Sequence, residues 1–234
     1  MQQADFFDVE GHQYAHALVV RPPLHTSNEL NAVLARLGRH PGIESVVDFG
    51  AGSGRLTIPL LRHRYSVLGV DVSDKSLDNL RRLAKRLALP VPRVARELPR
   101  DMSFDAVVGT DILHHVDLDS QLPLVHDALR DGGRLVFSEP GGCNPTWYVY
   151  LPLTAPWHIE RGVRQITYRN LRRKLEDHGF VDVSIVGLGL LPRPFFNWSA
   201  RLSRLNDVLG DLPLVRLFAY RYLIEAGVNR KRGR

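Results

Sequence analysis

The chain has 234 residues, a formal net charge of +6 and a single cysteine, Cys143. Its 44% hydrophobic and 24% charged residues are typical of a globular domain and exclude a disordered or fibrous chain. Because the sequence has no apolar run of about 18 residues and no signal-like start, we expect a cytoplasmic protein without a membrane-spanning helix or an internal disulfide.

Short apolar runs alternate with longer helical patterns along the chain, which predicts an α/β domain with a mainly parallel sheet. The predicted strands cover residues 45–49, 65–70, 91–95, 105–109, 134–138, 181–186 and 220–228. Helices are predicted from about residue 55, at 76–89, near 113, at 122–129 and at 167–178, where Gly179 provides a C-cap. In such folds ligands bind beyond the carboxyl ends of the strands.

A glycine-rich turn, DFGAGSGR from Asp48 to Arg55, follows the first predicted strand and opens a helix. Glycines allow the backbone to turn tightly and to approach a ligand closely. The next strand ends at Asp71, whose carboxylate can accept two hydrogen bonds from a ribose diol. Together the turn and the acid predict a nucleoside-containing cofactor, although a glycine turn in an unrelated βα unit is the alternative.

The spacing of the glycines separates two cofactor classes. A dinucleotide site has the pattern Gly-x-Gly-x-x-Gly, whereas this turn has Gly-x-Gly-x-Gly and carries Arg55 at the third dinucleotide position. The carboxylate of Asp48 at the strand end is unfavourable for a pyrophosphate and favourable for a cationic, amine-bearing cofactor. The pattern therefore indicates S-adenosylmethionine (SAM), with Asp48 among the cofactor-binding candidates.

Four segments resemble motifs of the class I SAM-dependent methyltransferases, particularly the small-molecule branch that includes quinone-biosynthesis enzymes. They are VVDFGAGSG at 46–54, GVDVS at 69–73, FDAVVGTDILHHV at 104–116 and LRDGGRLVFSEP at 129–140. The resemblance spans roughly residues 45–188. It implies a Rossmann-like sheet of seven strands in the order 3-2-1-4-5-7-6, mostly parallel with an antiparallel seventh strand, and helices on both faces.

The resemblance also implies cofactor contacts in the glycine turn and after the second strand. Gly50, Ala51 and Gly52 would pass under the methionine part of SAM. Asp71 would hold the ribose, and Val72 would pack on the adenine. The product would be S-adenosylhomocysteine.

Two further contacts are implied at the third and fourth strands. Thr110 would offer its backbone to the amino-acid end of the cofactor. Relatives usually carry an acid after the third strand that binds the adenine amine, but Val94 occupies that place here. The backbone at Ala95 is left as the adenine contact.

Two histidines and a glutamate form the candidate catalytic group. His114 and His115 follow the fourth strand, and Glu139 ends the fifth. The implied order makes these strands neighbours, about 4.8 Å apart. A carboxylate can fix the tautomer of an imidazole and raise its basicity, so we predict His114 as a general base paired with Glu139. The alternative is that His115 is a packing residue and Glu139 caps the loop before Pro140.

No metal is predicted. Metal-dependent catechol-type relatives need an Asp-Asn pair after the fifth or a later strand, and the only such pair, Asp78-Asn79, follows the second. His12 and His16 have the i,i+4 spacing of metal ligands but lack a third nearby ligand.

Residues 1–40 are expected to form an N-terminal helical cap, in which Phe6, Phe7 and Tyr14 close over the cofactor. Residues 41–234 would form the methyltransferase domain, with acceptor-site insertions at about 141–164 and 190–215. Nine of the 19 aromatic residues lie between positions 147 and 198. An aromatic lining suits a flat or apolar acceptor, although these rings could instead pack the insertions onto the sheet.

An amphipathic helix is predicted at 199–212, with leucines on one face and Arg201 and Arg204 opposite. Such a helix can lie on an anionic membrane, which makes 199–219 a candidate for peripheral membrane contact. A lid or core helix is the more common role.

These features predict a SAM-dependent methyltransferase for a small, lipophilic or aromatic acceptor, with O-methylation favoured over N- or C-methylation. The +6 charge leaves an RNA or DNA methyltransferase as an alternative, but no Asn-Pro-Pro-Tyr type sequence follows the fourth strand. A non-catalytic SAM-binding protein of the same fold is the third hypothesis. The sequence leaves the acceptor and the oligomeric state open.

Overall fold

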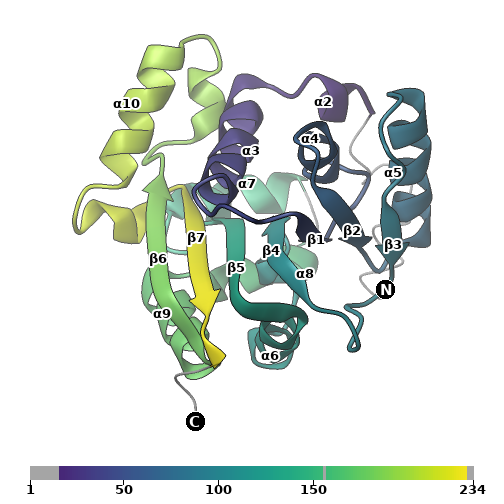
Figure 1. Cartoon of the computed structure of the whole chain (residues 1–234). Helices are drawn as coiled ribbons and strands as arrows, with labels where there is room; N and C mark the ends of the chain where they lie inside the picture. Colours follow the sequence, from purple (N-terminus) through teal and green to yellow (C-terminus); the bar gives the residue numbers. More distant parts are fainter. Residues whose placement is uncertain (1–15, 155–156, 231–234) are drawn as a thin grey trace.

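The computed structural model describes residues 16–154 and 157–230. Seven strands form one sheet in the order β3-β2-β1-β4-β5-β7-β6, which confirms the predicted order (Figure 1). β7 is antiparallel to β5 and β6, and the other neighbouring strands pair in parallel. The strands are β1 Ser45–Phe49, β2 Ser66–Val70, β3 Arg93–Ala95, β4 Phe104–Thr110, β5 Leu129–Pro140, β6 Phe180–Leu188 and β7 Arg221–Val228.

Helices cover both faces of the sheet, as predicted. They are α2 (His16–Val20), α3 (Leu24–Leu37), α4 (Thr57–Arg62), α5 (Asp74–Arg86), α6 (Leu118–Ala128) and α9 (Tyr168–Asp177). Because side chains alternate between faces along a strand, Val47 joins the core under α6 and α9 while Val46 joins the core under α3, α4 and α5. β4 is buried along its whole length, as a central strand covered on both sides should be.

The fifth strand begins earlier than predicted. We expected a turn at Asp131–Gly133 and a strand from Arg134, whereas β5 starts at Leu129. The register with β4 shifts between the pairs Phe104↔Leu129 and Ala106↔Arg134. Residues 130–133 therefore form an irregularity within β5. Gly132 makes this geometry accessible because its φ is +76°.

The expected cap and insertions are partly helical. The first insertion forms α7 (Pro145–Thr154), α8 (Trp157–Glu160) and the 3-10 turn η3 (Arg161–Gln165). The second forms η4 (Arg193–Phe196), α10 (Ala200–Gly210) and η5 (Val215–Phe218). Within residues 1–40, α3 packs against β5 and β7 and is part of the domain core. Phe6, Phe7, His12 and Tyr14 lie outside the described residues.

The leucine face of α10 is not the face that packs on the domain, because α10 contacts β6 through the opposite face. Ser203, Asn206 and Gly210 are buried, and Gly210 lies directly against the backbone of Gly189. Leu205 is 53% exposed, and Leu209 is 40% exposed. Small and amide side chains permit this close backbone approach, which leaves the leucines facing away from the sheet.

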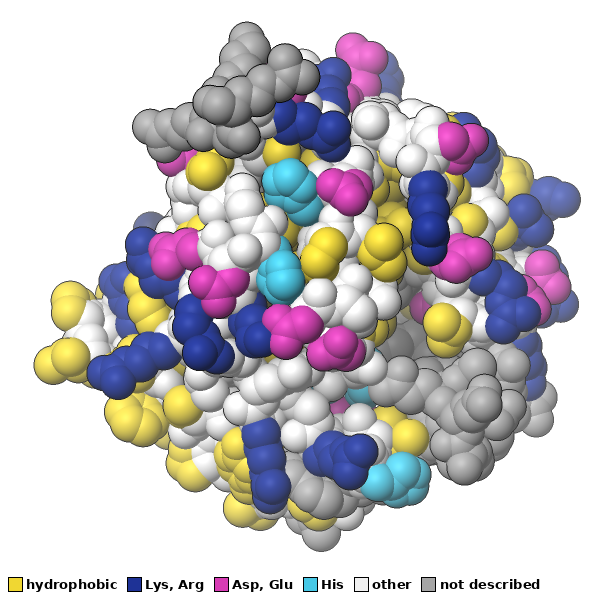
Figure 2. All heavy atoms as spheres, turned by 90° about the horizontal axis from the view of Figure 1, so that it is seen from below, with side chains coloured by type: hydrophobic (Ala, Val, Ile, Leu, Met, Phe, Trp, Pro, Cys, Tyr) yellow, Lys and Arg dark blue, Asp and Glu magenta, His cyan; other side chains and the backbone are white. Residues whose placement is uncertain are grey.

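The face of the molecule seen from below is mixed in charge (Figure 2). Figure 2 shows basic and acidic side chains interspersed across the face seen from below, without a continuous basic field. A duplex or single-stranded nucleic acid needs such a field to neutralise its phosphates. Among the described residues, no helix is both long and apolar enough to cross a bilayer.

Candidate functional site

A cavity of about 870 Å³ opens where β1, β2 and β4 end. Phe49, Val70 and Thr110, the last residues of these strands, line it. Cofactor and ligand pockets usually have volumes of about 300–1,000 Å³, so this cavity is large enough for a nucleoside-sized ligand. Its position at the carboxyl ends of parallel strands is the one expected for this class of sheet.

The glycine turn forms one wall of the cavity. The backbone N–H groups of Gly50 and Ala51 donate to the carbonyl of Val70, at 2.8 and 2.9 Å, which ties the turn to β2. Gly50 has φ +78°, and a Cβ atom there would lie 2.7 Å from Ile112. At Gly52, with φ +49°, a Cβ atom would meet nothing within 4 Å. The turn therefore presents bare backbone to the cavity.

Asp71 is held in place at the end of β2. One carboxylate oxygen accepts a hydrogen bond from the backbone N–H of Gly52 at 2.8 Å, and the other accepts one from Ser73 at 2.9 Å. Val72 also lines the cavity. Ala95 does not line the cavity, and its carbonyl accepts a hydrogen bond from the N–H of Asp71. Arg96, Glu97 and Leu98 line that wall instead.

Asp48 lies outside the cavity lining, contrary to the expected contact with the cofactor. Its side chain is buried beneath the turn and accepts a hydrogen bond from the hydroxyl of Thr57 at the start of α4. Burial raises the pKa of Asp48 to about 7, although the bond from Thr57 opposes this shift. Asp48 thus joins β1 to α4 and supports the turn from below.

Asp48→Asn is expected to flatten the pH dependence of stability. The pKa of Asp48 is about 7 in the folded chain and near 4 in the unfolded chain, so protonated Asp48 stabilises the fold. This stabilisation is complete below about pH 4, declines as the pH rises, and is lost above about pH 7. The free energy of unfolding should therefore fall by about 3 kcal/mol between pH 5 and pH 8. Urea unfolding at both pH values should show this loss in the natural chain and not in the variant. An unchanged pH dependence would contradict the assigned environment, and the exposed Asp78→Asn serves as the control.

Four charged side chains meet on the cavity wall; Glu29, Arg55 and Arg221 are largely buried, and Asp111 is 31% exposed. Arg221 of β7 lies 2.5 Å from Asp111 and 2.9 Å from Glu29 of α3. Arg55 lies 2.6 Å from Asp111 and 3.2 Å from Glu29. Burial raises the pKa of Asp111, but the two guanidinium groups outweigh burial and hold the pKa well below its usual range. The cluster therefore contains two carboxylates and two guanidinium groups, all facing one cavity.

The structure brings His114 and Glu139 together. His114 lies in the 3-10 turn η2 (Leu113–His115), and its Nδ1 is 2.7 Å from Glu139. The other oxygen of Glu139 accepts from the backbone N–H groups of Ile112 and Leu113, both at 2.8 Å. Glu139 is fully buried, so these three donors compensate for the burial of its charge.

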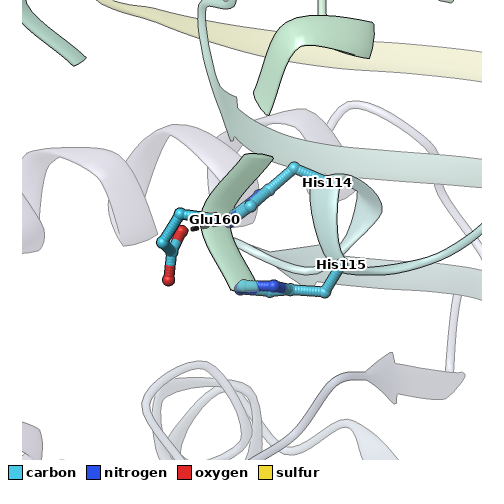
Figure 3. Close-up of side chains that lie close together, drawn as sticks. All are labelled: His114, His115 and Glu160. Carbon is cyan, nitrogen blue, oxygen red and sulfur yellow. Dashed lines mark ion pairs between the residues drawn. The ribbon is translucent and has the colours of Figure 1, made fainter. Parts of the chain in front are cut away.

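A second carboxylate, from an insertion, reaches the same imidazole. Figure 3 shows Glu160 of α8 beside His114, and the His114 Nε2 is 3.4 Å from a Glu160 oxygen. Burial lowers the pKa of His114, but the hydrogen bonds to Glu139 and Glu160 and the charges of Glu139 and Asp111 outweigh burial and raise the pKa to about 9. His114 is therefore an imidazolium at neutral pH.

His115 has the opposite protonation. Burial and the charge of the adjacent His114 lower its pKa to about 4, so His115 is neutral at pH 7. The two rings lie with centroids 3.9 Å apart. His114, His115 and Glu160 together offer three atoms within 4.8 Å of one another, a set that could hold a metal ion. A metal on His114 would have to displace the proton that Glu139 and Glu160 stabilise, and the absence of a metal stays a prediction.

Aromatic rings from the first insertion, together with Tyr220 before β7, form another part of the cavity wall. Trp147 stacks on Tyr220 with centroids 4.4 Å apart, and its Nε1 donates to the Tyr220 carbonyl at 2.7 Å. Tyr150 meets Trp147 edge-on at 6.1 Å. All three line the cavity, so the rings both pack the insertion and present an apolar surface to a ligand.

The charge cluster and Glu160 were not predicted. Arg55 carried a local signal, since it directly follows the glycine turn. Glu29, Glu160 and Arg221 belong to no motif, and only the topology of the sheet brings them to the cavity. β7 carries two charged residues, Arg221 and Glu225, and nothing in its sequence marks Arg221 as the one that reaches the cavity.

Comparison with known proteins agrees with this geometry. A family model described as a methyltransferase domain matches residues 47–135. An uncharacterised methyltransferase of Mycobacterium tuberculosis is 41% identical over 91 residues, which cover 38% of this chain and 37% of that protein. The human mitochondrial ubiquinone biosynthesis O-methyltransferase is 28% identical over 218 residues, which cover 79% of this chain and 57% of that protein.

The fold is shared with a solved structure from Haemonchus contortus. Phosphoethanolamine N-methyltransferase 2, in complex with SAM, superposes with a TM-score of 0.68 at 17% identity. The match covers 98% of this chain and 60% of that one. The chain thus spans between about a third and two thirds of the length of these relatives.

Proposed function

We propose, from the membership of this chain in the class I SAM-dependent methyltransferases, that it transfers a methyl group from SAM to a small apolar or aromatic acceptor. The observation that carries the proposal is a single cavity that joins the glycine turn and Asp71 to the His114–Glu139 pair and to an aromatic wall. SAM would supply the methyl group as an electrophilic sulfonium, with S-adenosylhomocysteine as the product.

The residues around the glycine turn fit such a cofactor. Asp71 keeps its carboxylate at the cavity edge, and a carboxylate there can accept hydrogen bonds from a ribose diol. Gly50, Ala51 and Gly52 offer a wall without side chains beyond a methyl group. Val72 is half-exposed beside Asp71 and supplies an apolar contact for a flat ring.

The charge cluster fits the amino-acid end of the cofactor. That end carries an ammonium and a carboxylate, and the cluster offers both signs in a largely buried setting. Asp111 would attract the ammonium, while Arg55 would attract the carboxylate. Thr110, the last residue of β4, lies directly before Asp111 and lines the same wall, which agrees with its predicted backbone contact.

Proton removal from the acceptor would fall to His114. Its Nδ1 is held by Glu139, so the Nε2 is the nitrogen that can exchange a proton with an acceptor once Glu160 moves aside. Neutral His114 is a strong base because both carboxylates raise its pKa. His115 lines the cavity beside it and would contact the acceptor as a neutral ring. We favour an acceptor hydroxyl, whose proton needs such a base, over nitrogen or carbon.

Two observations support an apolar acceptor. Trp147, Tyr150 and Tyr220 give the cavity a large aromatic surface, and the human relative named above is an O-methyltransferase of ubiquinone biosynthesis. The interspersed charges on the face shown in Figure 2 give no support to a nucleic-acid substrate there.

Transfer of label from methyl-labelled SAM into an organic extract tests this proposal. The purified chain should label an apolar product and release S-adenosylhomocysteine, at a rate that EDTA changes less than twofold. A loss of activity in EDTA that Mg²⁺ or Zn²⁺ restores would contradict the metal-free reaction. Tight SAM binding without transfer would favour the non-catalytic hypothesis, and preferential labelling of RNA would favour the nucleic-acid one.

A further inference from the structure

α10 presents an exposed apolar face on the edge of the molecule. It lies beyond β6 in Figure 1 and packs on β6, η4 and η5. Leu202, Leu205, Val208 and Leu209 are all exposed, while Ser203, which also accepts a hydrogen bond from Asn28 at 3.2 Å, is buried. Burying polar residues and exposing leucines costs hydrophobic free energy unless something covers the leucines.

The turns on either side of α10 extend this face. Phe195 in η4 is 70% exposed, and Trp198, just before the helix, is 78% exposed. Leu214, before η5, is 79% exposed. The indole N–H of Trp198 donates to the Phe195 carbonyl at 3.0 Å, which ties the Trp198 ring to the backbone of η4. Exposed tryptophan and phenylalanine beside leucines are typical of side chains at a bilayer interface.

Two arginines on α10 remain unpaired among the described residues. Arg201 lies one turn before Leu205 and two turns before Val208, so it falls within the apolar face rather than opposite it; Arg204 lies at its edge. Within residues 16–154 and 157–230, no hydrogen bond or ion pair engages either guanidinium group. Long basic side chains within an apolar face can place their charges at lipid phosphates while their stems stay in the apolar layer.

The acids of this segment are already neutralised. Asp207 pairs with Arg193 at 2.9 Å, and Asp211 lies 3.5 Å from Arg216. Among the described residues of this face, the unpaired charges are therefore those of Arg201 and Arg204. A second copy of the chain, packed face to face, would bring like charges together, whereas an anionic surface would complement them.

The face is continuous with the mouth of the cavity. Pro194 lines the cavity, and its neighbour Phe195 points into the solvent from the same turn. Arg193, also in η4, is buried on the cavity wall and pairs with Asp207 of α10. One short element thus connects the cavity to the exposed apolar face.

We propose that the outer face of α10, with the flanking residues Phe195, Trp198 and Leu214, docks on an anionic lipid bilayer. The leucines and rings enter the boundary between headgroups and acyl chains, to a depth of about 5–10 Å. Arg201, within the face, and Arg204, at its edge, extend their guanidinium groups to lipid phosphates. Docking in this orientation places the cavity mouth at the membrane surface, where an apolar acceptor would be dissolved. The binding itself does not depend on methyl transfer.

Vesicle flotation with the full chain tests the proposal. Vesicles of phosphatidylcholine with about 30% phosphatidylglycerol should carry the protein, and vesicles of phosphatidylcholine alone should carry much less. Leu205→Ser with Leu209→Ser should lower the partition at least tenfold. Arg201→Gln with Arg204→Gln should lower it about fivefold per arginine and weaken its dependence on salt.

Matched variants outside the face provide the controls. Val91→Ser removes an exposed apolar side chain before β3, and Arg62→Gln with Arg169→Gln removes two exposed charges from α4 and α9. These variants should float as the natural chain does. Failure of the natural chain to bind anionic vesicles, or undiminished binding of the leucine variant, would overturn the proposal. So would a dimer in sedimentation equilibrium that the leucine variant dissociates without any flotation, because the face would then belong to a second copy.

Discussion

Asp71→Ala is expected to raise the dissociation constant for SAM about 10- to 100-fold. A carboxylate that accepts hydrogen bonds from a ribose diol contributes about 1.5–3 kcal/mol, and each 1.4 kcal/mol is a tenfold change in affinity. The same substitution removes the two bonds that Asp71 makes to the backbone of Gly52 and Ser73, which loosens the glycine turn. Calorimetric titration with SAM and with S-adenosylhomocysteine measures the effect.

Asp78→Asn is the matched control, because Asp78 is an exposed acid on α5 that does not line the cavity. Its affinity for SAM should stay within twofold of the natural chain. Thermal unfolding of the Asp71 variant without ligand separates lost binding from lost folding. Equal SAM affinity in the Asp71 variant, or heat released with NADH in place of SAM, would refute the assigned cofactor site.

His114→Gln is expected to lower kcat about 10²- to 10⁴-fold for a hydroxyl acceptor, the usual contribution of a general base. In the natural chain kcat/KM should rise with pH and level off near pH 9, because His114 must lose its proton to act and its pKa is raised to about 9. Glu139→Gln removes one carboxylate that raises this pKa. The pH at which kcat/KM levels off, the break in the profile, should therefore move down toward pH 6.5. SAM affinity should change little in either variant.

The position of the break distinguishes the two histidines. A base at His115 would give a rate that is already level above about pH 5, since burial and His114 lower its pKa to about 4. His63→Gln, on the exposed end of α4, is the control and should leave the profile unchanged. If His114→Gln keeps kcat within twofold, the imidazole is a structural partner of Glu139 and Glu160, and the proposed base is wrong.

The sequence was most informative where the chemistry is local. The glycine turn and the acid after β2 lie within one βαβ unit, so their spacing alone indicated a shared wall, and the resemblance supplied the strand order. The adjacency of β4 and β5 then predicted that His114 and Glu139 lie close together, and the structure places their side chains 2.7 Å apart.

Residues joined by topology alone could not be predicted. Glu29 and Arg221 come from opposite ends of the domain, and no local pattern marks either as part of the cavity. The periodicity of α10 identified two faces but not which one is buried, because that depends on the backbone of Gly189 and Gly210 meeting across the contact. Asp48 was misplaced because a strand-end acid can face the ligand or the helix behind it, and burial alone decides between them.

The position of β7 between β5 and β6 has a consequence for biosynthesis. β7 follows the other six strands of this sheet in chain order and so leaves the ribosome after them. It supplies Arg221, which pairs with Asp111 and Glu29. Until β7 inserts, Asp111 and Glu29 on the cavity wall lack one of the two guanidinium groups that pair with them. The nascent protein therefore acquires a balanced ligand pocket late in synthesis, when its sheet closes, and an incomplete chain should be unable to retain the cofactor.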